Sequence, residues 1–214
     1  MNQLKLSLFA FVLLFISIAM AHGDDIHLNK LNYCNVTKIT MNDYEPAVFE
    51  TTNNLLRKAG EKPIYCGEKI IVHGRVLDQN CVPVSDAIVY AWQANCNGKY
   101  PYQPLKTIID KELINVDPNI TFTGNGTATT NNKGEFHFVT VYPPAMHENP
   151  SHINIRIEHH RLGSLQTSLV LRGKKVNNPE ANPELGSIAD VVAEHDINIY
   201  DFEIVLPGSV LKEY

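Results

Sequence analysis

One histidine of this sequence begins a predicted strand, from which its side chain could bind a metal ion. The stretch "NPSHINIRI", residues 149–157, has a proline, a small residue and His152, followed by apolar residues at alternate positions. This alternation predicts a strand with one buried face, so His152 would lie at the mouth of a β-sandwich. Neutral imidazole is a common metal ligand. His152 is therefore a candidate ligand, and the alternative is a histidine with only a structural role.

The sequence lacks the short motifs of several other functional classes. It has no G-x-S-x-G nucleophile elbow, no H-E-x-x-H zinc motif and no glycine-rich phosphate loop. Its composition is that of an ordinary globular protein, with 44% hydrophobic and 19% charged residues. Because the net charge is −5 and no run of lysine and arginine is interleaved with aromatic residues, nucleic acid is not an expected partner.

From Lys69 onward the pattern is typical of short β-strands. "KIIVHGRVLD" and "DAIVYAWQA" are rich in β-branched and aromatic residues, and "QNCVPVS" between them contains turn formers. Further strands are predicted in "FHFVTVYP", "HINIRIEH", "TSLVLRG" and "INIYDFEIVLPG", the last with a bulge near Asp201. Short strands separated by turns, without helical periods between them, predict an all-β fold, an antiparallel β-sandwich.

The chain divides into three predicted regions. Residues 1–21 contain Lys5, an apolar run and the Ala19-Met20-Ala21 site, which predict a secretory signal peptide. Residues 22–65 are a predicted N-terminal arm, with one short helix in "EPAVFETTNNLLRKAG" that ends at Gly60. Residues 66–214 form the sandwich domain. The expected location is secreted, either extracellular or periplasmic, with no membrane association after signal cleavage.

All four cysteines lie in the predicted mature chain, and an even number in an exported protein favours disulfides. If residues 69–77 and 86–94 are consecutive antiparallel strands, Cys66 and Cys96 lie at one end. Cys81 then lies at the other end, about 25–30 Å away at roughly 3.3 Å per residue. A disulfide tolerates Cα separations of only about 7 Å. We therefore predict the pairs Cys66–Cys96 and Cys34–Cys81.

Residues 73–100, "HGRVLDQNCVPVSDAIVYAWQANCNGKY", resemble the signature of the intradiol ring-cleavage dioxygenases, the protocatechuate and catechol dioxygenases. "TTNNKGEFHFVTVYP" and "INIYDFEIVLPG" are similar to later strands of that family, so the resemblance covers roughly residues 65 to 208. It implies a β-sandwich that binds Fe(III) and uses O2 to open a catechol ring between its two hydroxyls. The signature is matched by Gly74, Val76, Asp78, Pro83, Trp92, Gln93, Ala94, Gly98 and Tyr100.

The resemblance implies an iron site of two tyrosines and two histidines, but only part of it carries over. Tyr100 matches the first tyrosine and His152 the first histidine. Phenolate is a hard anionic donor that suits Fe(III). Asn154 stands where the family has its second histidine, and Met146 where it has its second tyrosine. Two of the four ligands are therefore matched.

Residues around these ligand positions also differ from the family pattern. Asn149 replaces an arginine expected to stabilise charge on the substrate, and in a loose alignment Ser168 replaces a glutamine. Tyr142 and His147 lie in the loop before His152 and are candidate replacement ligands. Two functions stay open: a secreted Fe(III) enzyme acting on a small aromatic diol with O2, or a non-catalytic secreted β-sandwich that is a binding or structural module.

Overall fold

The computed structural model describes residues 33–41, 44–107, 110–146, 149–172, 187–189, 191–194 and 197–210. The predicted signal peptide and His147 lie outside the described residues. Within them, no helix has the length and apolar character needed to cross a membrane.

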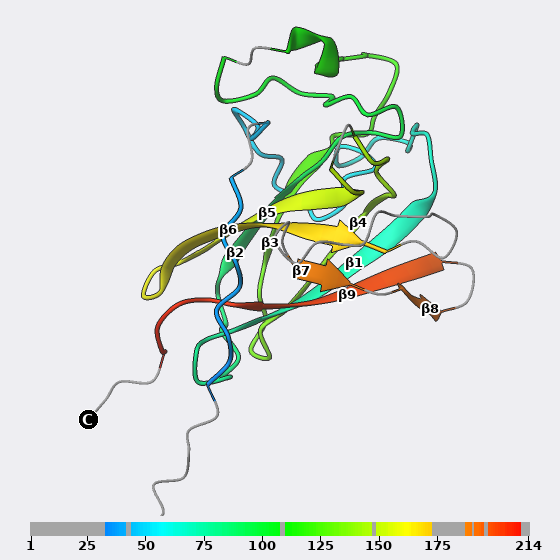
Figure 1. Ribbon diagram of the computed structural model, residues 1–214. Helices are drawn as coiled ribbons and strands as arrows, with labels where there is room; N and C mark the ends of the chain where they lie inside the picture. The colour runs from blue at the N-terminus through cyan, green and yellow to red at the C-terminus, as the bar shows by residue number, and fades with distance from the viewer. Residues whose placement is uncertain are drawn as a thin grey trace, which may run out of the picture. The chain divides into compact units, whose positions relative to one another are not determined.

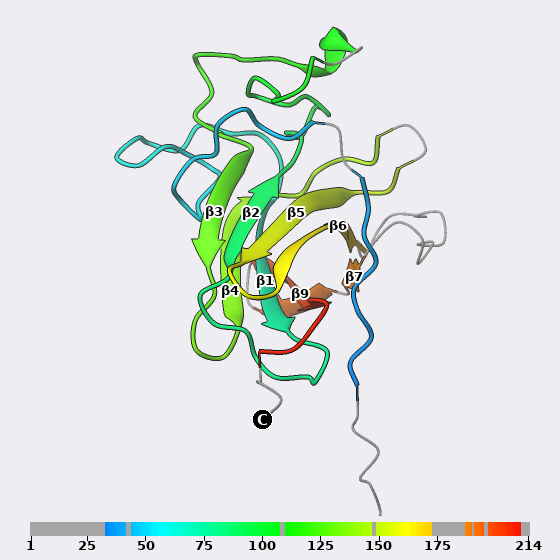
Figure 2. The ribbon, with the colours of Figure 1, turned by 90° about the vertical axis from the view of Figure 1, so that its left-hand side faces the viewer.

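Two β-sheets pack face to face, as the prediction of a sandwich requires (Figures 1 and 2). The long connection between β2 and β3 extends beyond one end of the sheets and contains the 3-10 helix η1, Lys111–Leu113. The four-stranded sheet has the order β4 (Glu135–Val141), β1 (Lys69–Leu77), β9 (Ile197–Val205), β8 (Val191–Glu194). The five-stranded sheet has the order β3 (Asn125–Thr129), β2 (Ile88–Trp92), β5 (His152–His159), β6 (Gly163–Leu171), β7 (Ser187–Ala189).

The sheet pairing differs from the predicted one in three respects. Two pairs, β1 with β9 and β6 with β7, are parallel, while the others are antiparallel. The strands β1 and β2 are not a hairpin, because they belong to opposite sheets. The predicted bulge near Asp201 is wrong, since β9 stays in continuous register with β1 from Asn198 to Val205.

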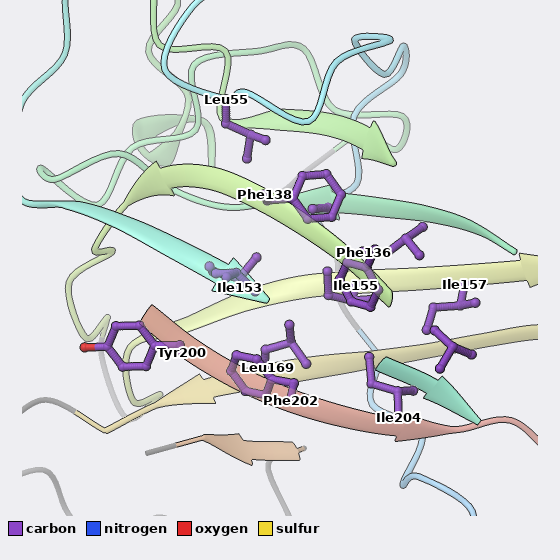
Figure 3. Packing of buried hydrophobic residues seen from close by; sticks show 14 of the residues in the cluster. Leu55, Phe136, Phe138, Ile153, Ile155, Ile157, Leu169, Tyr200, Phe202 and Ile204 are labelled. Carbon is purple, nitrogen blue, oxygen red and sulfur yellow. The ribbon is translucent and has the colours of Figure 1, made fainter. Parts of the chain in front are cut away.

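The alternation of β5 separates two faces of the five-stranded sheet. Ile153, Ile155 and Ile157 are buried in the core between the sheets, where Figure 3 shows them near Phe136, Phe138 and Leu169. Because neighbouring residues of a strand point to opposite faces, His152, Asn154 and Arg156 lie on the outer face. The strand thus contributes to the core and to a polar row at the same time.

The predicted helix within residues 45–60 is wrong, because these residues bond to the sheets rather than to one another. The Leu55 N–H donates to the Val139 carbonyl at 2.9 Å, and the Val139 N–H donates to the Asn53 carbonyl at 2.9 Å. These bonds cover the free edge of β4. Leu55 itself is fully buried and points toward the core (Figure 3).

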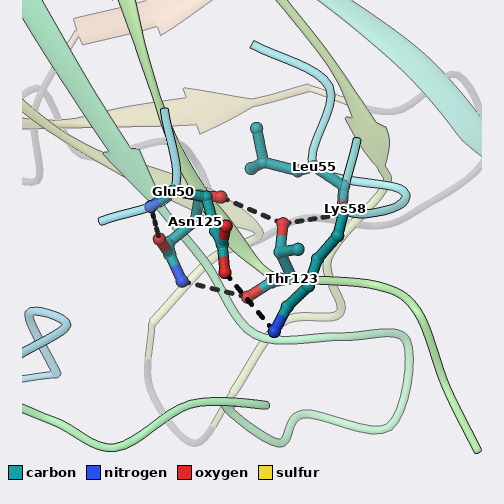
Figure 4. Close-up of polar contacts among 5 residues, drawn as sticks. All are labelled: Glu50, Leu55, Lys58, Thr123 and Asn125. Carbon is teal, nitrogen blue, oxygen red and sulfur yellow. Dashed lines mark hydrogen bonds and ion pairs between the residues drawn. The ribbon is translucent and has the colours of Figure 1, made fainter. Parts of the chain in front are cut away.

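The same segment also bonds to the edge strand of the other sheet. The Thr127 N–H of β3 donates to the Thr52 carbonyl at 3.0 Å, and Glu50 donates through its N–H to the Asn125 side chain at 2.9 Å (Figure 4). A Cβ at Gly126 would lie 2.1 Å from the Thr52 oxygen, so only glycine permits this close approach. Residues 50–55 therefore join β3 to β4 across one open side of the sandwich.

On the opposite side, residues 33–41 join β9 to β6 (Figure 1). The Thr37 N–H donates to the Val205 carbonyl at 3.0 Å, and the Val205 N–H donates back to the Thr37 hydroxyl at 2.8 Å. The Thr40 N–H donates to the Gln166 carbonyl at 3.0 Å. From here on, the arm means residues 33–56, which are part of the predicted N-terminal arm of residues 22–65. The contacts of these residues close both open sides of the sandwich.

Both disulfides are present in the predicted pairing. Cα atoms lie 5.3 Å apart in Cys34–Cys81 and 5.8 Å apart in Cys66–Cys96. The first bond ties the arm to the turn after β1. In that turn the buried carboxylate of Asp78 accepts backbone N–H groups from three residues, Asn80, Val82 and Val210. The aspartate of the signature therefore has a structural role.

We expect replacement of Leu55 by alanine to show that the arm is part of the fold. Truncating a fully buried leucine costs about 2–5 kcal/mol of the free energy of unfolding, through lost burial and the cavity left behind. The matched control is Val48→Ala, since Val48 lies in the same segment but is 80% exposed. Chemical denaturation monitored by fluorescence measures both. Equal losses of stability in the two variants would contradict the conclusion that the arm is part of the fold.

Candidate functional site

The outer face of the five-stranded sheet carries a second group of packed side chains, which we call the outer cluster. Trp92 of β2 and Tyr100 of the following loop are buried in it, whereas Val89 and Ala91 of β2 point to the main core. The cluster contains the buried residues Trp92, Ala94, Tyr100 and Tyr102, packed against the partly buried residues Tyr44, Phe49, Leu113, Ile114 and Met146. It brings Tyr100 to the face on which His152 lies.

Tyr100 is held by its backbone and by aromatic neighbours. Its N–H donates to the Leu113 carbonyl at 2.7 Å, which fixes it to the loop around η1. The Tyr44 ring of the arm stacks on the Tyr100 ring, with centroids 4.4 Å apart and planes 5° from parallel. The Tyr102 ring meets it edge-on at 5.8 Å. One face of the Tyr100 ring is therefore covered by the arm.

The side chain of Asn154 lies beside the Tyr100 hydroxyl and affects its pKa. Burial, and to a lesser degree the neighbouring Tyr44, raise the pKa of Tyr100 to about 12. The Asn154 side chain lowers that pKa, as expected where an amide N–H is directed at the phenol oxygen. Tyr100 is consequently a neutral phenol near pH 7.

Asn154 is almost fully buried and has more than one partner. It lies opposite Trp92 of β2 and opposite Ser168 of β6. The Ser168 hydroxyl donates to the Asn154 side-chain oxygen at 3.4 Å, and Thr40 of the arm lies 3.1 Å from the Ser168 hydroxyl. Asn154, at the place of the family's second histidine, thus bonds to Ser168, at the place of the family's glutamine.

His152 lies two residues before Asn154, on the same face of β5. Its Nδ1 is 2.8 Å from the Pro150 carbonyl. A carbonyl can only accept, so Nδ1 carries the proton and Nε2 keeps its lone pair. Burial lowers the pKa of His152, and the bond to Pro150 offsets this in part. His152 is therefore a neutral imidazole in the tautomer that binds metals through Nε2.

Tyr142, one of the two candidate replacement ligands, packs against the main core rather than in the outer cluster. Its hydroxyl donates to the Leu171 carbonyl at 3.4 Å, and its ring centroid is 6.0 Å from that of Tyr200. His147, the other candidate, lies outside the described residues. The structure therefore brings Tyr100 and His152 to one face, and Tyr142 to a different group of side chains.

The loop before His152 closes on itself. Met146 donates its N–H to the Asn149 carbonyl at 3.0 Å, and Asn149 donates back at 2.9 Å. Met146 packs at the border of the outer cluster, in the region where the family resemblance places a second tyrosine. A thioether is a soft ligand and a poor substitute for a phenolate on Fe(III).

The described donors do not complete the iron site that the resemblance implies. Tyr100 and His152 are present, and an amide and a thioether stand at the other two ligand positions. This donor set does not fit a four-ligand ferric centre.

Sequence reasoning missed Arg156, which is next in the polar row of β5. Its guanidinium lies 4.4 Å from the Tyr90 ring centroid and forms an ion pair with Glu45 of the arm. Its Nε is 3.2 Å from a Glu158 oxygen. The signal available in the sequence was the alternation itself, which places Arg156 on the face of His152 and Asn154.

Gln93, part of the W-Q-A motif, joins the two sheets. Its side-chain amide donates to the Val141 carbonyl at 2.9 Å, and its oxygen accepts from the Thr140 hydroxyl at 2.8 Å. Both partners belong to β4 of the opposite sheet. This motif residue therefore stabilises the fold near the outer cluster without facing a substrate.

Comparisons with known proteins agree with this architecture. A family model described as dioxygenase matches residues 39–175. The chain is 50% identical to the "Putative dioxygenase" of Rickettsia bellii, over 87% of this chain and 88% of that protein. It is 32% identical to the protocatechuate 3,4-dioxygenase beta chain of Burkholderia cepacia, over 78% and 74% of the two chains. The intradiol ring-cleavage dioxygenase of Tetranychus urticae shares the fold, with a TM-score of 0.61 at 17% identity, covering 81% and 95%.

The interaction between Tyr100 and Asn154 can be measured by a double-mutant cycle. We expect Tyr100→Phe and Asn154→Ala to be non-additive in the free energy of unfolding, with a coupling of about 1 kcal/mol, typical of one hydrogen bond. Chemical denaturation of the parent, both single variants and the double variant gives this number. The cycle of Tyr102→Phe with Asn154→Ala is the control. Additive effects in the first cycle would contradict the contact.

Proposed function

Since the chain belongs to the intradiol ring-cleavage dioxygenase family, we propose that it is an exported member that has kept the fold but not the ring-cleaving activity. In this proposal it is a non-catalytic β-sandwich that serves as a binding or structural module. The observation that carries the proposal is the contact between the Tyr100 hydroxyl and the Asn154 side chain. It joins two positions that, by the family resemblance, would both be iron ligands.

The cover over Tyr100 supports the proposal. The Tyr44 ring lies parallel to the Tyr100 ring at 4.4 Å, and the Tyr102 hydroxyl donates to the Tyr44 carbonyl at 3.1 Å. Backbone bonds from Leu105 to Glu45 and from Ala47 to Gln103 hold the two segments together. A planar diol could stack on this face of Tyr100 only by displacing an aromatic ring that is already packed there.

The proposal of export rests on two features. The first 21 residues have the pattern of a secretory signal. The cysteines form two disulfides, which persist in oxidising compartments and are rare in reducing ones.

Ring cleavage is the second candidate function, and one observation favours it. His152 presents an Nε2 lone pair on the face where Tyr100 lies, and its Nδ1 is oriented by the Pro150 carbonyl. In this alternative Tyr100 and His152 would hold Fe(III) with a further donor from the loop. The bound ion would supply the activation of a catechol toward O2.

Iron loading of the purified mature protein separates the two candidates. We expect the protein to remain colourless with Fe(III) and to show no oxygen uptake with catechol or protocatechuate, because two of the four donors are missing. A visible tyrosinate charge-transfer band, metal analysis and an oxygen electrode give the result. A red-brown protein that consumes O2 and is bleached by Tyr100→Phe would overturn the proposal.

A variant with restored donors is the matched control for this experiment. Met146→Tyr with Asn154→His supplies the ligand types that the family resemblance assigns to these positions. We expect the variant to bind more iron than the parent under the same loading conditions, provided that circular dichroism shows a folded protein. If the folded variant binds as little iron as the parent, Met146 and Asn154 do not account for the low iron binding of the parent.

A further inference from the structure

The outer face of the four-stranded sheet, away from the outer cluster, carries two histidines and an aspartate in one row. His73 of β1 lies directly opposite His137 of β4 and directly opposite Asp201 of β9. His73 and Asp201 are about half exposed, with side-chain exposures of 44% and 50%, and His137 is exposed. Neither the proposed function nor the family resemblance uses these residues.

The backbone pairing brings the two histidines close together. Val139 directs its N–H and carbonyl away from β1, to Asn53 and Leu55, so it belongs to a non-hydrogen-bonded pair of the antiparallel ladder. His137 lies two residues before Val139, so His73 and His137 also form a non-hydrogen-bonded pair. Residues of such a pair have Cα atoms about 4.5 Å apart, with side chains on one face. The His73 and His137 rings can therefore reach one metal ion.

Asp201 orients the ring of His73. Its Oδ1 is 2.8 Å from His73 Nδ1, so that nitrogen is the one engaged with the carboxylate. The other nitrogen, Nε2, is then available. A histidine that binds a metal through one nitrogen commonly donates from the other to a carboxylate, which fixes the ring and raises its basicity.

His137 is held by a weaker contact that a metal can replace. The Asn53 side-chain amide lies 2.9 Å from His137 Nε2 and also donates to the His137 carbonyl at 3.3 Å. Both contacts are exposed, and the amide can keep its bond to the carbonyl when the ring turns toward His73. The loss of one exposed hydrogen bond costs little, because water can replace the partner.

We propose that His73 and His137 form a binding site for a divalent transition-metal ion on the outer face of the four-stranded sheet. Their two imidazole nitrogens are the protein ligands, Asp201 orients His73 without binding the metal, and water completes the coordination. As the described side chains stand, no three His, Cys, Asp or Glu residues surround one point, so this is an open two-histidine chelate. Imidazole ligands suit Cu²⁺, Ni²⁺ and Zn²⁺, and Cu²⁺ binds most tightly in the general order of divalent ions.

Copper titration of the full mature chain tests the site. Isothermal titration calorimetry with Cu²⁺ should show a binding event that His73→Gln and His137→Gln each weaken at least about 10-fold, and that Asp201→Asn weakens about 10-fold, as for other carboxylate partners of metal-bound histidines. Electron paramagnetic resonance of the Cu²⁺ complex should show coupling to nitrogen, reduced in both histidine variants. Asn53→Ala should strengthen binding, because it removes the competing amide.

His160→Gln is the matched control, since His160 is an exposed histidine beside the end of β5. It should leave the affinity unchanged. Thermal unfolding without metal should change little in the histidine and aspartate variants, because these side chains are exposed or about half exposed. Parent-like Cu²⁺ affinity in both His73→Gln and His137→Gln would overturn the proposal, and so would a loss of equal size in His160→Gln.

Discussion

The fold depends on how the edges of its two sheets are closed. An unpaired edge strand presents a row of free N–H and carbonyl groups, which invites pairing with other chains. Here β4 and β3 are the edges on one side, and the arm bonds to both through residues 50–55. Leu55 then fills the space between the sheets, so the hydrogen bonds and the apolar burial of this segment stabilise each other. The arm is an integral part of the sandwich.

The same arm links the fold to the candidate site. Between its two edge contacts it crosses the outer face of the five-stranded sheet, where Tyr44 stacks on Tyr100 and Glu45 pairs with Arg156. The Glu45 and Arg156 side chains are mostly buried, at 16% and 24% exposure. Removing one partner of such a pair leaves an uncompensated charge, which is costly. Access to Tyr100 therefore requires that interactions of the folded state be broken.

The strands were predictable from the sequence because each carries its own period-two pattern, and β5 begins and ends at the predicted residues. The segment "EPAVFETTNNLLRKAG" misled because a weak helical stripe is a local signal, while its bonds to Val139 and Thr127 are long-range and cannot be read from the segment itself. The parallel pair of β1 and β9 was missed for the same reason. In the site, Tyr100 and His152 were found through the family resemblance, whereas the contact of Tyr100 with Asn154 depends on how a long loop returns to the sheet.

The period of two in β5 also explains how a family member can change its iron site and keep its fold. Isoleucines 153, 155 and 157 face the core, so substitutions at 152 and 154 leave that packing untouched. Position 154 is nevertheless buried, and a buried polar group without partners is costly. An amide at this position is tolerated because the Ser168 hydroxyl bonds to it and the Tyr100 hydroxyl lies beside it. In this chain, hydrogen bonds join Asn154, Ser168 and Thr40 beside the Tyr100 hydroxyl, so these contacts occupy polar groups that a metal ion would otherwise organise, and they extend to the arm.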